Sequence, residues 1–452
     1  MRKDYFMPAG GSRMLQTLKV SENRRFLIQE NGEPFFWLGD TAWELFHKTT
    51  REDAELYLRK RAEQGFTVVQ AVALAEFEGV TTDNAHGRRP LRTNASGAVD
   101  PTLPDVEGPY SYWDHVDWVL SEAASLGLYI ALLPTWGDKF NKLWGKGPEI
   151  FTPENAFAYS RWLGERYRDA ENVIWVLGGD RPLQTRRHFE IVDAMARGLK
   201  AGDGGSRLMT FHPQGAQSSS HHVHDEEWLD FNMIQSGHGE AQITNYKRVL
   251  ADYERQPIKP TLDGEPCYED IPVGFRTENG YFDEADVRRA AYYAVLSGAL
   301  GHTYGHHSVW SMMDGPGGGE GHTYLMSWKQ ALRRPGAEQM RHVRSLAEAR
   351  GFGRLAPDPE MVAHNDAGNN YIAAARADDH AYVYTPNGAP IAAKLGRLPG
   401  GRLTASWFDP RTGGTESIGE IENEGVRRFA PPSAGRGSDW VLVLEAGPCS
   451  GS

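Results

Sequence analysis

The segment VIWVLGGD (173–180) is a short, continuously apolar run that ends in two glycines and an aspartate. It is too short for a helix, and its lack of polar alternation is typical of a parallel strand that is buried on both faces. Seven further runs of this kind are FFWLGD (35–40), VVQAVAL (68–74), YIALLPTW (129–136), LMTFHP (208–213), NMIQSGH (232–238), PTLDGE (260–265) and GHTYGHH (301–307). Together these runs predict eight parallel strands.

Amphipathic segments lie between the apolar runs and predict helices. Segment 152–167 begins Thr-Pro-Glu, which combines a capping hydroxyl, a preset φ and an acidic first turn. Segment 111–127 has Ser111 as its N-cap, and segments 51–65 and 283–299 are helical in the same way. Eight strands interleaved with helices predict a (β/α)8 TIM barrel of the α/β class. An open doubly wound sheet shares this alternation, but no glycine-rich phosphate-binding loop follows the first strand.

The character of the chain changes near residue 357. Short strand-like runs separated by Asn-Gly, Asp-Pro and Gly-Gly turns predict a small antiparallel β-sandwich over 357–447. We expect an N-terminal extension over 1–23, the barrel over 24–356 and a disordered tail over 448–452. The sandwich is expected to support the barrel without a ligand of its own, because its alternating aromatic residues are typical of a sandwich core.

The overall composition excludes several classes of partner. The chain has 452 residues, a formal net charge of −12 and 40% hydrophobic residues. An acidic surface repels phosphate groups, so neither nucleic acid nor an anionic membrane is expected as a partner. No run of about 18 apolar residues occurs, which argues against a membrane span. The oligomeric state is left open.

The N-terminal residues and the cysteines bear on the compartment. The start MRKDYFMPAGGSRMLQ lacks the apolar region of a signal peptide, so a cytoplasmic location is expected. A trimmed N-terminus would leave an extracellular or periplasmic location open. The two cysteines, Cys267 and Cys449, predict neither a structural disulfide nor a zinc cluster.

Polar and aromatic side chains collect where the apolar runs end, and in a (β/α)8 barrel these ends form the active-site face. Any one tryptophan or histidine is more often a packing or satisfied core residue, but the set as a whole predicts a binding site. Tryptophans offer stacking platforms for sugar rings, and polar groups can bind hydroxyls. The candidate substrate-binding residues are Asp40, Trp43, Glu76, Asn84, His86, Trp136, Trp144, His212, Gln235, His238, Tyr304, His306, His307 and Trp310.

Two carboxylates stand out because each closes a strong strand. Asp180 ends the fourth run and Glu265 ends the seventh. Glycoside cleavage needs one carboxylic acid to protonate the leaving oxygen and one carboxylate to attack carbon or activate water. The apolar strand and Trp175 are expected to help raise the pKa of Asp180. The alternative is that Asp180 is an ion-pair partner of Arg181.

Strand-end histidines raise a second mechanism, that of a metal-dependent barrel hydrolase. His212 and His238 close the fifth and sixth runs, as such an enzyme requires. The first strand, however, offers no His-x-His pair, and HHVH (221–224) is interpreted as a solvated segment rather than a ligand set. We therefore expect neither a metal nor another cofactor.

The segments FFWLGDTAWELFHK, GFTVVQAVALAE, LLPTWGDK, VIWVLGGDR, MTFHPQG, FNMIQSGH, LDGEPCYED and GHTYGHHSVW together resemble the apiosidase-like glycoside hydrolases (glycoside hydrolase family 140). The resemblance covers nearly the whole chain, and its C-terminal part is similar to the β-sandwich of that family that is named for collagen binding. It implies a retaining hydrolase that acts on apiose-containing side chains of plant pectin by double displacement. It further implies that Asp180 is the acid/base and Glu265 the nucleophile, although members of one family can differ in the sugar that they cleave.

Overall fold

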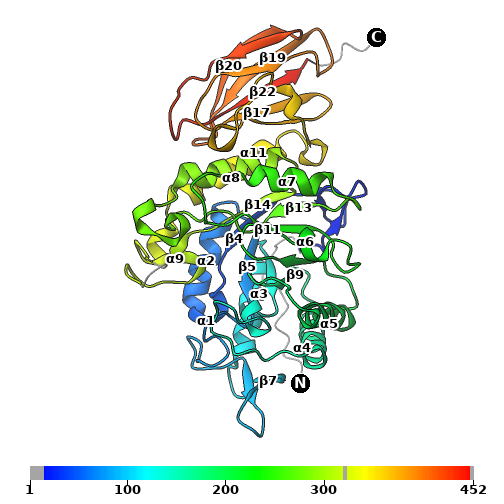
Figure 1. The fold of residues 1–452 in the computed structure, drawn as a ribbon, viewed down its shortest axis with the longest axis vertical. Helices are drawn as coiled ribbons and strands as arrows, with labels where there is room; N and C mark the ends of the chain where they lie inside the picture. The colour runs from blue at the N-terminus through cyan, green and yellow to red at the C-terminus, as the bar shows by residue number, and fades with distance from the viewer. Residues whose placement is uncertain (1–14, 319–322, 448–452) are drawn as a thin grey trace.

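The computed structural model describes residues 15–318 and 323–447, and Figure 1 shows a barrel below a smaller domain rich in strands. The expected tail over 448–452, Cys449 and the first part of the expected N-terminal extension lie outside the described residues. The described part of the N-terminal region forms a small antiparallel sheet of β1 (Lys19–Val20), β2 (Leu27–Ile28) and β3 (Pro34–Phe35).

Each of the eight apolar runs forms a strand of the barrel sheet. The strands are β4 (Trp37–Thr41), β5 (Val68–Val72), β8 (Tyr129–Leu133), β9 (Val173–Gly178), β10 (Met209–His212), β12 (Asn232–Gln235), β13 (Thr261–Asp263) and β14 (Gly301–Tyr304). Their order is β10-β9-β8-β5-β4-β14-β13-β12, and all neighbouring pairs are parallel. This is the predicted (β/α)8 barrel.

The barrel closes where β10 and β12 meet. The carbonyl of Met209 accepts a hydrogen bond from the amide of Asp230 at 2.9 Å, and the hydroxyl of Thr210 donates to the carbonyl of Phe231 at 2.6 Å. A short ninth strand, β11 (Gln217–Ser218), pairs antiparallel with β12. The sheet is therefore nearly closed, and the carboxyl ends of its parallel strands come together at one end.

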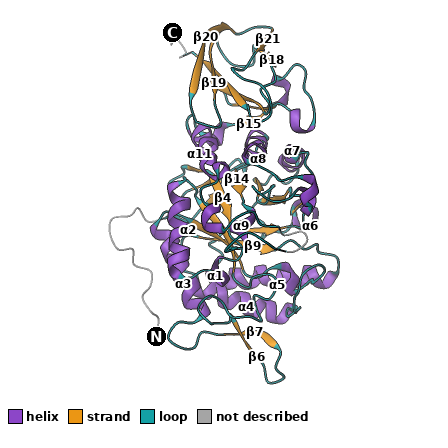
Figure 2. Cartoon of the chain, turned by 90° about the vertical axis from the view of Figure 1, so that its left-hand side faces the viewer, coloured by secondary structure: helices purple, strands orange, loops and turns teal. Residues whose placement is uncertain are grey.

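Helices surround the strands (Figure 2). The long ones are α2 (Arg51–Glu63), α3 (Tyr112–Ser125), α4 (Pro153–Arg166), α5 (Arg186–Asp203), α7 (Asn245–Glu254), α8 (Glu284–Leu296) and α11 (Pro335–Glu348). The short ones are α1 (Leu45–Lys48), α6 (Ser220–Val223), α9 (His307–Trp310) and α10 (Trp328–Ala331). The hairpin of β6 (Leu91–Thr93) and β7 (Val99–Pro104) projects from the barrel. The interpretation of 221–224 as a solvated segment holds only for its first half, because His221 is exposed and His222 half-buried, whereas Val223 and His224 are buried.

The predicted helix starts carry side-chain caps. The hydroxyl of Ser111 accepts from the amide of Asp114 while the Asp114 carboxylate accepts from the Ser111 amide, and Thr152 and Asn155 repeat this capping box at α4. Such boxes satisfy amides that the first turn of a helix leaves without partners. Pro153 at the first position of α4 adds a preset φ.

Side chains along β9 alternate between the barrel interior and the helix layer. Trp175 lies in the hydrophobic cluster shared with the surrounding helices, and its indole nitrogen donates to Asp203 on α5 at 2.7 Å. The expectation that Trp175 raises the pKa of Asp180 is therefore wrong. The side chain of Trp175 points from the strand into the helix layer, because neighbouring residues of a strand face opposite sides of the sheet.

The C-terminal domain is antiparallel throughout, as predicted. A six-stranded sheet contains β15 (Ala356–Pro357), β16 (Ala373–Arg376), β17 (His380–Thr385), β22 (Trp440–Ala446), β19 (Arg402–Phe408) and β20 (Thr415–Glu422) in this order. A two-stranded sheet pairs β18 (Ile391–Lys394) with β21 (Val426–Phe429). Both sheets contribute to one hydrophobic core. This arrangement is the small sandwich that the turn-rich sequence indicates.

The sandwich lies against α7, α8 and α11 of the barrel (Figure 1). Arg288 on α8 and Asp439 form an ion pair at 2.7 Å, with only 2% of each side chain exposed. The ring of Tyr292 stacks on that of Tyr384, with centroids 4.8 Å apart. Buried charge pairing together with aromatic stacking makes this contact a fixed interface.

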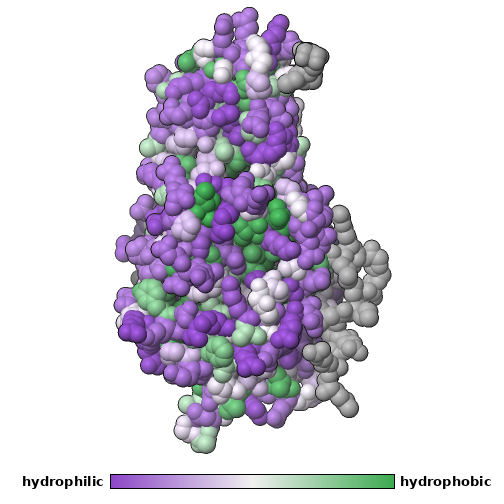
Figure 3. Space-filling view, turned by 90° about the vertical axis from the view of Figure 1, so that its right-hand side faces the viewer, coloured by the Kyte–Doolittle hydropathy of each residue, from purple (hydrophilic) through white to green (hydrophobic). Residues whose placement is uncertain are grey.

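One face of the molecule is mostly polar. On the face drawn in Figure 3, hydrophilic side chains cover most of both domains, and hydrophobic ones gather near mid-height. Within residues 15–318 and 323–447, no helix is both long and apolar enough to cross a membrane.

The cap of α4 gives a test of the local rules that build the barrel. We expect Thr152→Ala to lower the free energy of unfolding by about 1 kcal/mol, since it leaves the Asn155 amide without its acceptor. Urea denaturation followed by circular dichroism measures the change. Thr152→Ser keeps the hydroxyl and is the matched control. Equal losses in the two variants would contradict the role of the hydroxyl.

Candidate active site

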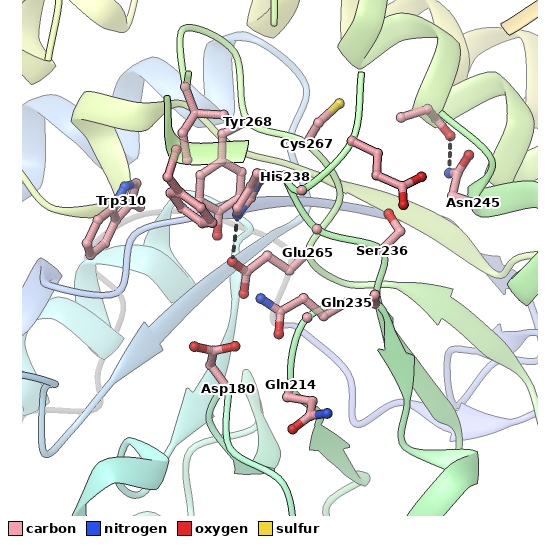
Figure 4. A pocket seen from close by; sticks show the side chains of 18 of the residues that line it. Asp180, Gln214, Gln235, Ser236, His238, Asn245, Glu265, Cys267, Tyr268 and Trp310 are labelled. Carbon is pink, nitrogen blue, oxygen red and sulfur yellow. Dashed lines mark hydrogen bonds and ion pairs between the residues drawn. The ribbon is translucent and has the colours of Figure 1, made fainter. Parts of the chain in front are cut away.

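A cavity of about 880 Å³ opens where the barrel strands end (Figure 4). Its wall is drawn from segments that follow most of the strands, so residues distant in the sequence share one space. The expected site residues that line it are Trp43, Glu76, Trp136, Trp144, Asp180, Gln235, His238, Glu265 and Trp310. The arrangement places both acids in one cavity at the active-site face.

The backbone at Asp180 is tightly constrained. Asp180 lies two residues beyond the end of β9, after Gly178 and Gly179, and all three residues have positive φ values, 89°, 109° and 55°. A Cβ at Gly179 would lie 2.7 Å from the amide nitrogen of Gly137, so the position requires glycine. The left-handed conformation of a non-glycine residue at Asp180 marks a strained turn of the kind that clusters at functional sites.

The Asp180 carboxyl group is half-buried and contacts two cationic or polar donors. The indole nitrogen of Trp144 donates to Oδ2 at 3.1 Å, and the guanidinium of Arg181 donates to the same oxygen at 3.0 Å. Burial and the nearby charge of Glu265 raise the pKa of Asp180, although Arg181, His212 and Trp144 oppose the rise. Asp180 therefore both lines the cavity and forms an ion pair with Arg181.

Glu265 has the opposite electrostatic setting. It lies two residues beyond β13, and its Oε1 is 3.2 Å from Nε2 of His238 while its Oε2 is 2.8 Å from Nε2 of His212. Burial opposes ionisation, but the two histidines hold the pKa of Glu265 at about 2. At neutral pH this side chain is a carboxylate.

His212 connects the two acids. Its Nδ1 accepts a hydrogen bond from the backbone amide of Asp180 at 3.3 Å, so the ring proton sits on Nε2, which faces Glu265. The ring is fully buried and lies against Trp43 and Trp136, with centroids 5.3 Å and 5.6 Å away. His212 is thus held beneath the cavity, and its orientation is fixed on every side.

Tyr268 is a member of the site that the strand-end pattern does not indicate. Its hydroxyl accepts from the indole nitrogen of Trp43 at 3.2 Å, and its ring lies 4.4 Å from that of His238. Burial and the adjacent Glu265 carboxylate raise the pKa of Tyr268 well above its usual range. A sequence signal exists, because Tyr268 follows Glu265 by three residues in GEPCYED.

A third acid, Glu76, faces the cavity beside Asp180. Burial raises its pKa well above the usual range, and the charges of Glu44 and Asp180 add to the rise. The pKa of the buried Glu44 is itself raised to about 7. Next to this group, Asp138 and Lys139 form a fully buried ion pair at 2.8 Å. This environment favours the protonated form of Glu76, and a protonated carboxyl group can both donate to and accept from a polar ligand.

Three expected site residues lie in the barrel wall and do not line the cavity. Asp40 is fully buried and accepts from Arg61 at 2.7 Å and from Tyr57 at 2.6 Å, both on α2. Tyr304 donates to Glu269 at 2.6 Å. His306 lies 3.0 Å from Asp270 and caps α9. These groups join strands to neighbouring segments.

Other expected residues shape loops around the site. The side chain of Asn84 accepts from the amides of His86 and Arg88 at 3.0 Å and 3.1 Å. The ring of His86 lies 4.5 Å from that of His115. His307 stacks on Tyr324 at 4.3 Å. None of the three expected residues Asn84, His86 and His307 is among those that line the cavity.

The histidines do not gather as a metal site. Among residues 15–318 and 323–447, no group of three or more His, Cys, Asp and Glu side chains is arranged to hold a metal ion. His212 and His238 instead both direct Nε2 toward one carboxylate, that of Glu265.

Comparisons with known proteins identify the family of the chain. The family model described as "Apiosidase-like, catalytic domain" matches residues 21–353, and the model described as "Putative collagen-binding domain of a collagenase" matches residues 356–445. A glycoside hydrolase family 5 protein from Bacteroides vulgatus is 34% identical, with a TM-score of 0.86 over 95% of this chain and 93% of that one. A second structure, described as a glycoside hydrolase, is 33% identical, with a TM-score of 0.84 over 96% and 97%. No curated protein matches the chain.

A barrel with two carboxylates that face a cavity at its strand ends is the architecture of a glycoside hydrolase. The two similar structures are themselves described as glycoside hydrolases. The chain belongs to the apiosidase-like family.

The place of Asp40 in the barrel wall can be tested against its expected role in substrate binding. Asp40→Ala leaves Arg61 buried without its partner, so we expect the free energy of unfolding to fall by about 3–5 kcal/mol. The KM of the folded variant should stay at the wild-type value, because Asp40 does not line the cavity. Denaturation and steady-state kinetics below the unfolding transition measure both. A raised KM with unchanged stability would contradict this placement.

Proposed function

We propose that the protein is a retaining glycoside hydrolase that acts on pectin-type glycans of the plant cell wall, with Asp180 as acid/base and Glu265 as nucleophile. The observation that carries the proposal is the opposition of two pKa shifts in one cavity. The pKa of Asp180 is raised, while that of Glu265 is about 2. Paired acids whose environments separate their pKa values in this way divide into a proton donor and a charged partner.

In the first step, the Glu265 carboxylate attacks the anomeric carbon while Asp180 gives its proton to the departing glycosidic oxygen. The bond to the leaving group breaks, and a glycosyl ester on Glu265 forms. In the second step, water attacks the same carbon and gives its proton to the Asp180 carboxylate. The ester bond breaks, Glu265 regains its charge, and the sugar leaves with its original anomeric configuration.

The electrostatics of the cavity suit this exchange of roles. The negative charge of Glu265 is one cause of the raised pKa of Asp180. Ester formation removes that charge, so the pKa of Asp180 falls as the step that needs a base begins. Arg181 and the Trp144 indole stabilise the ionised form of Asp180 during this interval. His212 and His238 meanwhile stabilise Glu265 as a leaving carboxylate.

The substrate class is supported by the cavity wall and by the family. Trp43, Trp136, Trp144 and Trp310 line the cavity, where aromatic side chains can pack against sugar rings. The buried Oε1 atom of Gln235 has no hydrogen-bond partner among the described residues, so it can accept from a sugar hydroxyl. Apiose-containing pectic side chains are the substrates that the family name suggests. The second candidate function is hydrolysis of another sugar by an enzyme of the same family, because these aromatic side chains do not distinguish one sugar ring from another.

We expect Glu265→Gln to lower kcat/KM by roughly a thousandfold or more, because the amide cannot form the glycosyl ester. The assay is the release of sugars from pectic and arabinan-type oligosaccharides. Proton NMR of the first-formed anomer reports the stereochemistry. Near wild-type turnover by the variant, or release of the inverted anomer by the wild type, would contradict the mechanism. Release of a sugar other than apiose would contradict the substrate.

We expect Trp144→Phe to move the basic limb of the pH profile of kcat/KM to higher pH. Activity is lost as pH rises through the pKa of Asp180, and the indole donor lowers that pKa. Removing the donor raises the pKa and extends the active range upward. Trp310→Phe is the matched control, because its indole nitrogen donates to His307 rather than to an acid. A basic limb that stays in place, or moves equally in both variants, would contradict the assignment of Asp180.

A further inference from the structure

One wall of the cavity is an irregular segment, residues 236–244, which we call the cavity loop. It connects β12 to α7 and carries His238, a partner of Glu265. The members that line the cavity are Ser236, Gly237, His238, Gly239, Glu240, Gln242, Ile243 and Thr244. The position of this loop therefore sets both the shape of the cavity and the contact that holds Glu265 ionised.

The two halves of the cavity loop are held differently. In the first half, the amide of Gly237 donates to the carbonyl of Glu265 at 3.0 Å, and the carbonyl of His238 accepts from the amide of Gly274 at 2.8 Å. In the second half, the backbone of residues 239–243 makes two hydrogen bonds within the described chain, and both go to the side chain of Asn369. A loop with so few bonds of its own belongs to the part of a protein that opens most easily.

Asn369 belongs to the C-terminal domain. Its Oδ1 accepts from the amide of Ile243 at 2.7 Å, and its Nδ2 donates to the carbonyl of Ala241 at 3.1 Å. One side-chain amide thus pairs with an amide and a carbonyl of the cavity loop, in the way that a neighbouring strand would. Two bonds to positions two residues apart fix both the place and the orientation of the loop.

Asn369 is itself held in place from both domains. Its backbone carbonyl accepts from the side chain of Asn387 at 3.0 Å. The amide of Gly368 donates to the hydroxyl of Tyr246 at 3.2 Å, and the ring of Tyr371 stacks on Tyr246 with centroids 3.8 Å apart. Gly368 adopts a φ of 64°, and a side chain there would collide with Gln242 of the cavity loop. The segment around Asn369 is thus fitted to the loop.

We propose that Asn369 is a positioning residue for catalysis, through which the C-terminal domain holds the cavity loop and with it the contact between His238 and Glu265. This role rests on the proposed function of Glu265. Attachment of the two domains has other sources, namely the Arg288–Asp439 pair and the stacked tyrosines. The bonds of the Asn369 side chain go to the cavity loop alone among the described residues.

The test compares two matched asparagines in the full-length protein. Asn423 also bonds an amide and a carbonyl, accepting from the amide of Gly396 at 2.7 Å and donating to the carbonyl of Leu398 at 2.8 Å, but these bonds lie within the C-terminal domain. We expect Asn369→Ala to speed backbone hydrogen exchange in residues 239–243, and Asn423→Ala to leave that exchange unchanged. Asn369→Asp keeps the acceptor for the Ile243 amide and is expected to fall between Asn369→Ala and the wild type.

Kinetics give the second readout. We expect kcat/KM to fall on the order of tenfold in Asn369→Ala and to stay unchanged in Asn423→Ala, because small displacements of catalytic groups are costly. The acidic limb of the pH profile should move to higher pH. His238 is one of the groups that lower the pKa of Glu265, and a loosened contact lets this pKa rise. A variant that is only less stable would lower the unfolding midpoint without moving this limb.

Each outcome supports or refutes the proposed role of Asn369. Exchange in residues 239–243 that is equal in Asn369→Ala and Asn423→Ala refutes the hold on the loop. Faster exchange with unchanged kcat/KM and an unmoved acidic limb refutes the positioning role. Full activity of Glu265→Gln refutes the proposed function instead, and the exchange measurement then still shows whether Asn369 holds the loop.

Discussion

The site depends on the contacts that His212 makes with Asp180 and Glu265. Its imidazole is fixed by the amide of Asp180 on one side and faces the carboxylate of Glu265 on the other, while two tryptophans confine the ring. A ring held in this way has one proton position. The amide fixes the tautomer that places the ring proton on Nε2, which lies 2.8 Å from Oε2 of Glu265. His212 and His238 together lower the pKa of that buried carboxyl group. One side chain therefore contacts the backbone of one acid and the carboxylate of the other.

This contact exists because of the register between two strands. On neighbouring strands, His212 of β10 is directly paired with Gly178 of β9. The turn that follows Gly178 then brings the backbone of Asp180 over the imidazole. Glycine at 178 and 179 permits the positive φ values and the close approach of the neighbouring backbone. The chemistry of the site thus begins with a turn that few other residues could form.

The sequence predicts the barrel well because buried parallel strands leave a strong signal. All eight apolar runs form strands, and each of the two acids lies just past the end of its strand. Position at a strand end did not determine which way a side chain points. Asp40 faces α2, whereas Glu265 enters the cavity, and both follow similar runs. The facing direction depends on strand tilt and on partners such as Arg61, which are distant in the sequence.

The interface between the domains determines which surface an isolated barrel would expose. Tyr246, Tyr292 and Tyr293 of the barrel helices are buried against the sandwich, and Arg288 is neutralised there by Asp439. A fragment cut between the two family matches would present these aromatic rings to water beside an uncompensated charge. Such a surface favours self-association. The two domains match separate family models, but the sandwich covers aromatic side chains of the barrel that an isolated barrel would expose to water.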